Sequence, residues 1–270
     1  MRRNAVLRTS GRIAMVVMLG GLASTQCWYD IDQFQRDRAD TVEGDGGPTV
    51  HGESGVQEGD ADAPTTPCQG LHLLCDDFNG PTSLDSWLVD RKNGGQAAID
   101  VSDSVSAPGS LLITLPGSGR PEATLTRTLP PATPRVACRF MFRLSPSSST
   151  PIRVFAMHAK GDYPEYAVIL GVSDGSIVLT EFGRKTSSEP INVTHVGDSL
   201  TDGWQAIELD VRLGTNATGT LSIDGRTPSP ITLLSNGGGA IDSITLGLTP
   251  TDALSVATTA RVDDLVCDVP

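Results

Sequence analysis

The feature that most constrains the fold is a series of short segments, from Cys68 onward, in which apolar and polar residues alternate. Turn-forming pairs such as Asp174-Gly175 and Asp224-Gly225 separate these segments. Alternation is the pattern of a half-buried β-strand, and no window carries the spacing of an amphipathic helix of three turns. The pattern therefore predicts an antiparallel, all-β sandwich or barrel.

The segment 135–144 shows the alternation clearly, because Val136, Cys138 and Phe140 share one face while arginines lie on the other. The same pattern gives candidate strands at 71–78, 97–101, 110–115, 123–129, 135–144, 152–157, 166–172, 176–182, 204–212, 218–223, 231–234, 241–248 and 261–269. We expect one domain over residues 68–270, in which the first and last of these strands pair.

Residues 1–27 have the composition of an export signal. Arginines precede an apolar run from Ile13 to Ala23, which at eleven residues is too short to span a bilayer. The alternative is a bacterial lipoprotein signal with the lipid on Cys27, although Ser24 and Gln26 depart from the usual lipobox. We therefore expect an exported protein, either secreted or held on the outer surface of a bacterium.

Residues 28–67 contain ten acidic residues and two arginines, with little apolar periodicity. Such a segment cannot bury enough apolar surface to offset the entropy of ordering, so we expect a disordered linker. The formal net charge of the whole chain is −12. That charge argues against binding to nucleic acid or adhesion to anionic membranes, because both need a basic surface. Membrane attachment is expected only through a lipid anchor at Cys27.

Several motifs together resemble a known family. In chain order they are DDF at 76–78, tryptophan at 87, GSLLI at 109–113, GW at 203–204, SIDG at 222–225 and VDDLV at 262–266. This set resembles the concanavalin A-like lectin and glucanase jelly rolls, including the laminin-G-like domains of secreted bacterial proteins. The resemblance covers about residues 71–269 and implies an antiparallel two-sheet jelly-roll sandwich. It does not fix an activity, because one fold hosts many functions.

The catalytic motifs of enzymes with this fold do not match. The glucanase branch carries Glu-x-Asp-x-Glu on one strand, whereas here Glu208 and Asp210 are followed by Arg212, which cannot act as a carboxylate. The alginate-lyase branch carries Gln-x-His, and here Ala156 replaces the glutamine before His158. His158 is therefore a weak catalytic candidate, and the sequence favours a protein without catalytic activity.

Sugar binding in this fold usually relies on exposed aromatic rings that stack on the sugar. The chain is only 4% aromatic, and the tryptophans of the predicted domain stand where the family uses tryptophan for packing. Tyr163 and Tyr166, with Phe182, remain as candidate stacking residues, and Arg184 is a candidate hydrogen-bond donor to an acidic sugar.

Three functions stay open on this evidence. The first is a non-catalytic exported or cell-surface protein whose lectin-like sandwich contacts an envelope protein or acts as a spacer. The second is a carbohydrate-binding module with a polysaccharide partner. The third is a polysaccharide-degrading hydrolase or lyase with an atypical site. The missing catalytic motifs and few aromatic residues favour the first.

Four cysteines follow Cys27, an even number in a chain expected to be exported, and four allow three pairings. We favour Cys68 with Cys75, which closes a short loop. The resemblance implies Cys138 with Cys267, because in this fold the strand of Cys138 neighbours the closing strand. Free buried thiols are the alternative.

The resemblance also implies a structural calcium ion where the two ends of the domain meet. Relatives hold a cation with an aspartate of the closing strand, carbonyls of the opening strand and a glycine before the Gly-Ser-Leu strand. The matching positions are Asp264, the region of Asp76 and Asp77, and Gly109. Calcium accepts such mixed sets of carboxylate and carbonyl oxygens. The alternative is that these carboxylates face water or accept hydrogen bonds in turns.

Overall fold

The computed structural model describes residues 67–145, 149–161, 163, 165–184, 190–226, 230–234 and 239–270. The predicted export signal at 1–27, Cys27 and residues 28–66 of the predicted linker lie outside these ranges, so they stay predictions. Within the described ranges, no helix is long and apolar enough to cross a membrane.

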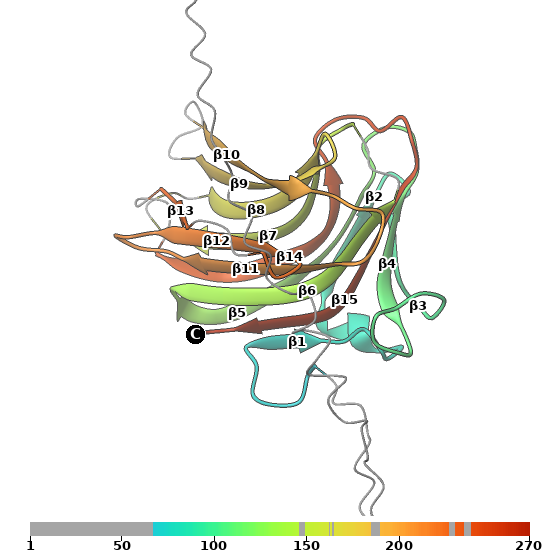
Figure 1. Ribbon diagram of the computed structural model, residues 1–270, viewed down its shortest axis with the longest axis horizontal. Coiled ribbons are helices and arrows are strands. Elements are labelled where there is room, and N and C mark those ends of the chain that lie inside the picture. The colour runs from blue at the N-terminus through green and yellow to red at the C-terminus, as the bar shows by residue number, and fades with distance from the viewer. Residues whose placement is uncertain are drawn as a thin grey trace, which may run out of the picture.

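The described chain forms two antiparallel sheets that pack face to face (Figure 1). The first sheet has eight strands in the order β13-β12-β11-β6-β15-β4-β3, and β1 also pairs with β15. Its members are β1 (Leu74–Asp76), β3 (Gln96–Asp100), β4 (Ser110–Leu115), β6 (Arg135–Ser145), β11 (Gln205–Arg212), β12 (Thr218–Ile223), β13 (Ile231–Thr232) and β15 (Thr258–Asp268).

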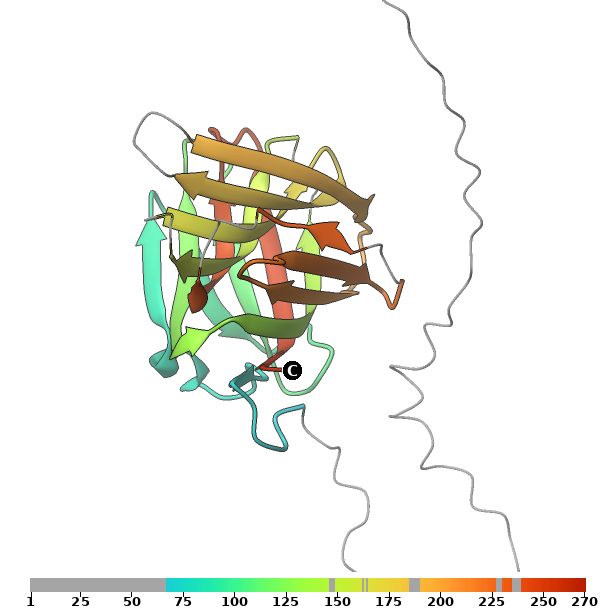
Figure 2. The same ribbon diagram turned by 90° about the vertical axis from the view of Figure 1, so that its left-hand side faces the viewer.

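The second sheet has seven strands in the order β10-β9-β8-β7-β14-β5-β2 (Figure 2). Its members are β2 (Leu88–Lys92), β5 (Glu122–Thr133), β7 (Ile152–Lys160), β8 (Glu165–Ser173), β9 (Ser176–Arg184), β10 (Pro190–Ser199) and β14 (Ala240–Pro250). A short 3-10 helix, η1 (Ser83–Ser86), precedes β2. The two sheets confirm the predicted jelly-roll sandwich.

The core lies between the sheets, where the alternation of the strands places it. Along β6, Val136, Cys138 and Phe140 are buried while Arg139 is exposed. One apolar cluster joins both sheets, and the rings of Phe140 and Phe155 of β7 have centroids 5.2 Å apart. Burial of these side chains is the main force that holds the two sheets together.

The first and last described strands lie side by side, as predicted. Cys75 of β1 lies opposite Val266 of β15, and both views place the C-terminus beside the first described segment (Figures 1 and 2). β15 itself is central in the eight-stranded sheet, because β6 and β4 flank it. The last strand therefore joins the two halves of this sheet.

The doubled aspartate of β15 forms a β-bulge. Asp264 and Leu265 together lie opposite Phe140 of β6, and Asp264 has a left-handed backbone with φ 53°. Aspartate is among the residues that tolerate this region. The extra residue shifts the phase of the strand, so Val262 and then Leu265 face the core.

Two strands were not predicted, and both lie at the edges of the seven-stranded sheet. β2 reads Leu-Val-Asp-Arg-Lys, and β10 begins with Pro190. Edge strands commonly carry charges and proline because these discourage pairing with other chains, which hides the strand signal. The predicted opening strand at 71–78 shortens to Leu74–Asp76, because the chain before it forms a disulfide-closed loop.

Candidate functional site

A groove of about 510 Å³ lies on the outer face of the eight-stranded sheet, over β12, β11, β6 and β15. Its volume is within the range of small-molecule sites. Side chains alternate along each strand, so most of the residues that line the groove point away from the core, while Cys138 and Leu209 belong to the core beneath it. The apolar side chains of these strands thus form the core, and most of the polar side chains between them form the groove.

The register of the four strands arranges the lining side chains in two rows. The first row crosses the sheet through Thr220, Asp210, Ala137 and Asp268. The second row crosses it through Ser222, Glu208, Arg139 and Val266. Neighbouring strands lie about 4.8 Å apart, so each row is about 14 Å long. The groove thus combines hydroxyl, carboxylate and guanidinium groups over a length that suits an extended ligand.

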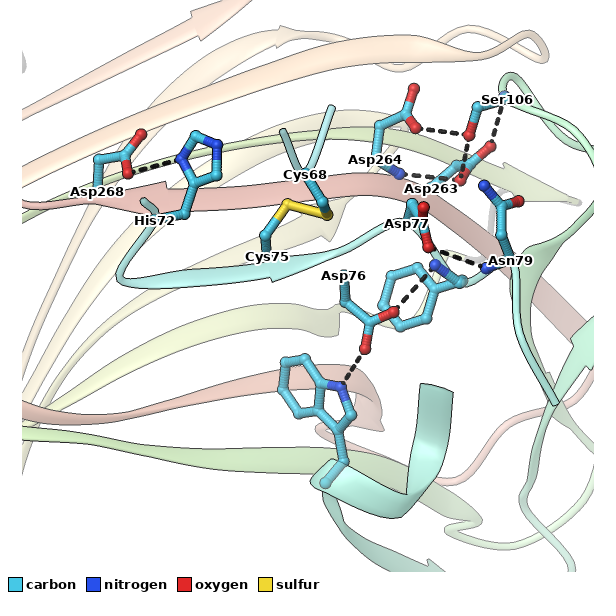
Figure 3. Close-up of a disulfide and its surroundings, with 12 residues drawn as sticks. Cys68, His72, Cys75, Asp76, Asp77, Asn79, Ser106, Asp263, Asp264 and Asp268 are labelled. Atoms are coloured by element: carbon cyan, nitrogen blue, oxygen red, sulfur yellow. Dashed lines mark hydrogen bonds and ion pairs between the residues drawn. A yellow bond between two sulfur atoms is a disulfide. The ribbon is translucent and has the colours of Figure 1, made fainter. Parts of the chain in front are cut away.

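Two of the three carboxylates in the groove have fixed partners. The Arg135 guanidinium donates to both oxygens of Asp210, with Nε 3.0 Å from Oδ1. Asp268 Oδ1 lies 2.9 Å from His72 Nδ1 (Figure 3). Glu208 is the most exposed of the three and lies directly opposite Arg139 on β6.

Both predicted disulfides are confirmed, and both support this groove. The Cys138–Cys267 bond joins β6 to β15, and its two side chains lie in the core beneath the groove. The Cys68–Cys75 bond closes the loop that carries His72 (Figure 3). Because His72 contacts Asp268, this loop helps to position one wall of the groove.

His158, the weak catalytic candidate, lies within β7 on the outer face of the seven-stranded sheet. Its Nε2 lies 3.1 Å from Thr245 Oγ1, which is 3.1 Å from Thr126 Oγ1. Burial holds the pKa of His158 below its ordinary value. Ala156 lies on the same face, inside a small apolar cluster with residues of β8. The hydrogen bonds described for His158 thus reach a threonine hydroxyl and no acid, amide or phenol.

The expectation that Tyr163 and Tyr166 offer stacking surfaces is wrong, because both rings are buried. Their exposed fractions are 7% and 2%, and their centroids lie 6.4 Å apart. The Tyr166 hydroxyl donates to Glu181 Oε2 at 3.0 Å, and burial with this carboxylate raises the pKa of Tyr166. Arg184 ends β9, but its side chain lies outside the described residues.

Glu181 is a buried acid that the sequence analysis missed. Its side chain is 1% exposed, and it accepts hydrogen bonds from the Tyr166 hydroxyl and from the Leu234 amide at 2.7 Å. His195 Nε2 lies 3.5 Å from Glu181 Oε1. The available signal was its position two residues after Leu179, on the buried face of β9. The group ties β8, β9 and β10 to the chain that follows β13.

The predicted tryptophan packing is observed at Trp87, which is buried, whereas Trp204 is half-buried. Trp87 Nε1 donates to Asp76 Oδ2 at 2.7 Å, and the Phe78 amide donates to Oδ1 at 2.9 Å. Both oxygens of Asp76 are therefore used, and the side chain points away from Asp264 (Figure 3). These bonds engage the carboxylate of Asp76, whereas the resemblance implies backbone carbonyls from this strand as calcium ligands.

The remaining predicted calcium ligands come together only in part. Asp77 Oδ1 accepts the Asn79 amide at 3.2 Å, and Asp264 Oδ1 accepts the Ser106 hydroxyl at 2.6 Å. A side chain at Gly109 would meet the Phe78 and Asp100 carbonyl oxygens at 3.2 and 3.3 Å, so carbonyls do converge there. Among the described residues, no three His, Cys, Asp or Glu side chains gather in a metal-binding group. The calcium ion stays a prediction.

No protein-family model matches this sequence, and no curated protein matches it. An endo-β-1,4-glucuronan lyase from the fungus Trichoderma reesei matches the structure with a TM-score of 0.58 and 12% identity, over 74% of this chain and 96% of that one. The cellulose-induced protein Cip1 matches with a TM-score of 0.51 and 16% identity, over 73% and 97%. Identities this low show the shared jelly-roll fold alone.

Proposed function

We propose that this chain is a non-catalytic, exported module that binds a polysaccharide through the groove on the eight-stranded sheet. The observation that carries the proposal is the groove of about 510 Å³ with its two rows of polar side chains. Sugar hydroxyls both donate and accept hydrogen bonds, so they can pair with carboxylates, hydroxyls and a guanidinium alike. The groove favours carbohydrate binding over the spacer function that the sequence favoured.

The structural neighbours support the same class of partner. One is named for cleavage of glucuronan and the other for its induction by cellulose. At 12% and 16% identity they carry over neither a substrate nor an activity. The name of the first neighbour supports a polysaccharide as the class of ligand, whereas the name of the second states only what induces it.

Binding without catalysis agrees with the side chains at both outer faces. Arg212 follows Glu208 and Asp210 where a glucanase has its second glutamate, and Asp210 is held by Arg135. His158 lacks the glutamine of the lyases, and its described hydrogen bond goes to a threonine. The catalytic motifs of the glucanase and lyase branches are therefore incomplete on both faces, which favours binding without cleavage.

The proposal includes export of the protein. The exported chain is either secreted or attached to the cell surface by a lipid on Cys27. Two disulfides support an oxidising compartment, because cytosolic proteins seldom keep them. An envelope protein is the alternative partner on the cell surface. Detection of acylated Cys27 in membrane fractions would separate a lipoprotein from a secreted protein.

The experiment that tests the proposal is binding of the purified full chain to a panel of neutral, acidic and amino polysaccharides, measured by depletion from solution. Glu208→Ala and Arg139→Ala should each weaken binding at least about tenfold, which is about 1.4 kcal/mol. Asp174→Asn, in the turn between β8 and β9 of the other sheet, is the matched control. Unchanged binding by both groove variants, or no binding to any polymer, would overturn the proposal. Release of unsaturated or reducing ends would show an enzyme instead.

A further inference from the structure

The groove contains more negative than positive charge. Glu208, Asp210 and Asp268 line it, and Arg139 is the one cationic side chain among its described lining residues. Arg135 lies just outside and neutralises Asp210. Among the described lining residues themselves, three carboxylates face one guanidinium group.

The single lining cation is also poorly placed to accept an acidic ligand. Arg139 lies directly opposite Glu208 in the register of β6 and β11. Side chains in such a pair have Cβ atoms about 5 Å apart. A ligand carboxylate brought to Arg139 would therefore also lie beside the exposed carboxylate of Glu208.

The charge of the whole domain acts in the same direction. Residues 68–270 contain 22 acidic and 14 basic side chains, so the domain is negative even without the acidic segment before it. A net charge of one sign repels polymers of the same sign before they reach the surface. This long-range repulsion adds to the local effect of Glu208.

We propose, on the basis of the function proposed above, that the groove selects a neutral, hydroxyl-rich polysaccharide and rejects polymers of uronic acids. Carboxylates accept hydrogen bonds from sugar hydroxyls, and the exposed carboxylate of Glu208 is accessible to them. Arg139 donates, while Thr220 and Ser222 offer hydroxyl groups at the far side of the groove. The proposed ligand thus differs from glucuronan, the acidic polymer in the name of one structural neighbour.

Matched polymer pairs test the selection, because they differ only by a carboxylate at the sugar C6. The pairs are oligomers of β-1,4-glucan and β-1,4-glucuronan, and of β-1,4-mannan and β-1,4-polymannuronate, titrated calorimetrically into the full chain. We expect at least one neutral member to bind, with its acidic counterpart at least about tenfold weaker at low salt. Raising the salt should strengthen binding of the acidic member and leave the neutral one unchanged, because salt screens repulsion.

The variant Glu208→Gln isolates the charge, because the amide oxygen still accepts hydrogen bonds. Glu208→Gln should reduce the difference in affinity between the neutral and acidic members of a pair. The control Asp174→Asn should leave this difference unchanged. Equal affinity of the native chain for both members would overturn the selection and leave polysaccharide binding intact. Binding of chitosan oligomers alone would show a cation site and also overturn it. Binding of no oligomer would overturn the proposed function itself.

Discussion

Cys138 and Cys267 lie directly opposite each other on neighbouring strands and are bonded, although 129 residues separate them in the sequence. Their bond joins β6 to β15 in the middle of the eight-stranded sheet, beneath the two rows of groove residues. The floor of the groove is therefore held by a covalent bond between two of its strands.

Replacement of this bond should cost more stability than replacement of the other disulfide. In the loop-entropy account, Cys138→Ala with Cys267→Ala should lower the free energy of unfolding by roughly 4–5 kcal/mol, because the closed loop is long. The Cys68–Cys75 bond closes only a short loop. Cys68→Ala with Cys75→Ala, the matched pair, should therefore lower the free energy of unfolding by roughly 2–3 kcal/mol. Urea denaturation measures both. Equal losses would contradict the ranking, and four reactive thiols in the denatured, unreduced domain would contradict both bonds.

Tyr166→Phe should lower the free energy of unfolding by about 1–3 kcal/mol, because it removes a hydrogen bond from the buried carboxylate of Glu181. Thermal and urea denaturation at pH 7 measure the loss. Thr180→Val is the control, since it removes an exposed hydroxyl contact with Thr194 and should change stability by less than about 0.5 kcal/mol. Equal effects of the two variants would show that the Glu181 contact contributes little.

Acid should destabilise the native protein more than the variant His158→Gln. Burial lowers the pKa of His158 in the folded state, so the unfolded state binds more protons below the ordinary value of about 6.5. The contribution of this side chain is therefore present above about pH 6.5 and is lost as the pH falls toward the lowered folded pKa.

Unfolding free energies of the two proteins between about pH 7 and 5 measure the effect. Burial raises the pKa of Asp263 to about 6, so its contribution has the opposite slope, but it is common to both proteins and cancels in their difference. Parallel curves would contradict the prediction for His158.

Calcium should raise the melting temperature of the full chain relative to excess chelator, if an ion joins β15 to the carbonyls near Gly109. Asp264→Ala should abolish the shift, because Asp264 supplies the carboxylate from the closing strand. Asp252→Ala, an exposed residue paired with Arg120, is the control and should keep the shift. Equal melting temperatures of the native chain in calcium and chelator would rule the site out.

The class of fold and most strands could be predicted because alternation and turn residues are local signals. The Cys138–Cys267 disulfide could be predicted because the resemblance supplied the neighbours of the closing strand, and Cys68–Cys75 because these two cysteines are close in the sequence. The groove could not, because it depends on four strands becoming neighbours. Glu208 and Asp210 were recognised on one face of their strand, but Arg139 and Asp268 come from distant strands.

The tyrosine prediction failed for a related reason. Tyr166 lies in β8, where residues 166–172 are all buried, but the sequence does not show that Glu181 accepts a hydrogen bond from its hydroxyl inside the core. A phenol is common at surfaces because its hydroxyl needs a partner, and Glu181 supplies that partner in the core. The bulge at Asp264 could not be predicted either. An extra residue in β15 can be recognised only once its pairing with β6 is known.

The central place of β15 has a consequence for how the protein is made. β15 follows every other described strand in the chain, yet it lies between β4 and β6. Until the ribosome has passed this segment, those two strands keep unpaired backbone edges, which are templates for aggregation. The sheet cannot close stepwise during translation, and pairings over such sequence distances form slowly. A chain that stops before Thr258 should therefore accumulate as insoluble protein.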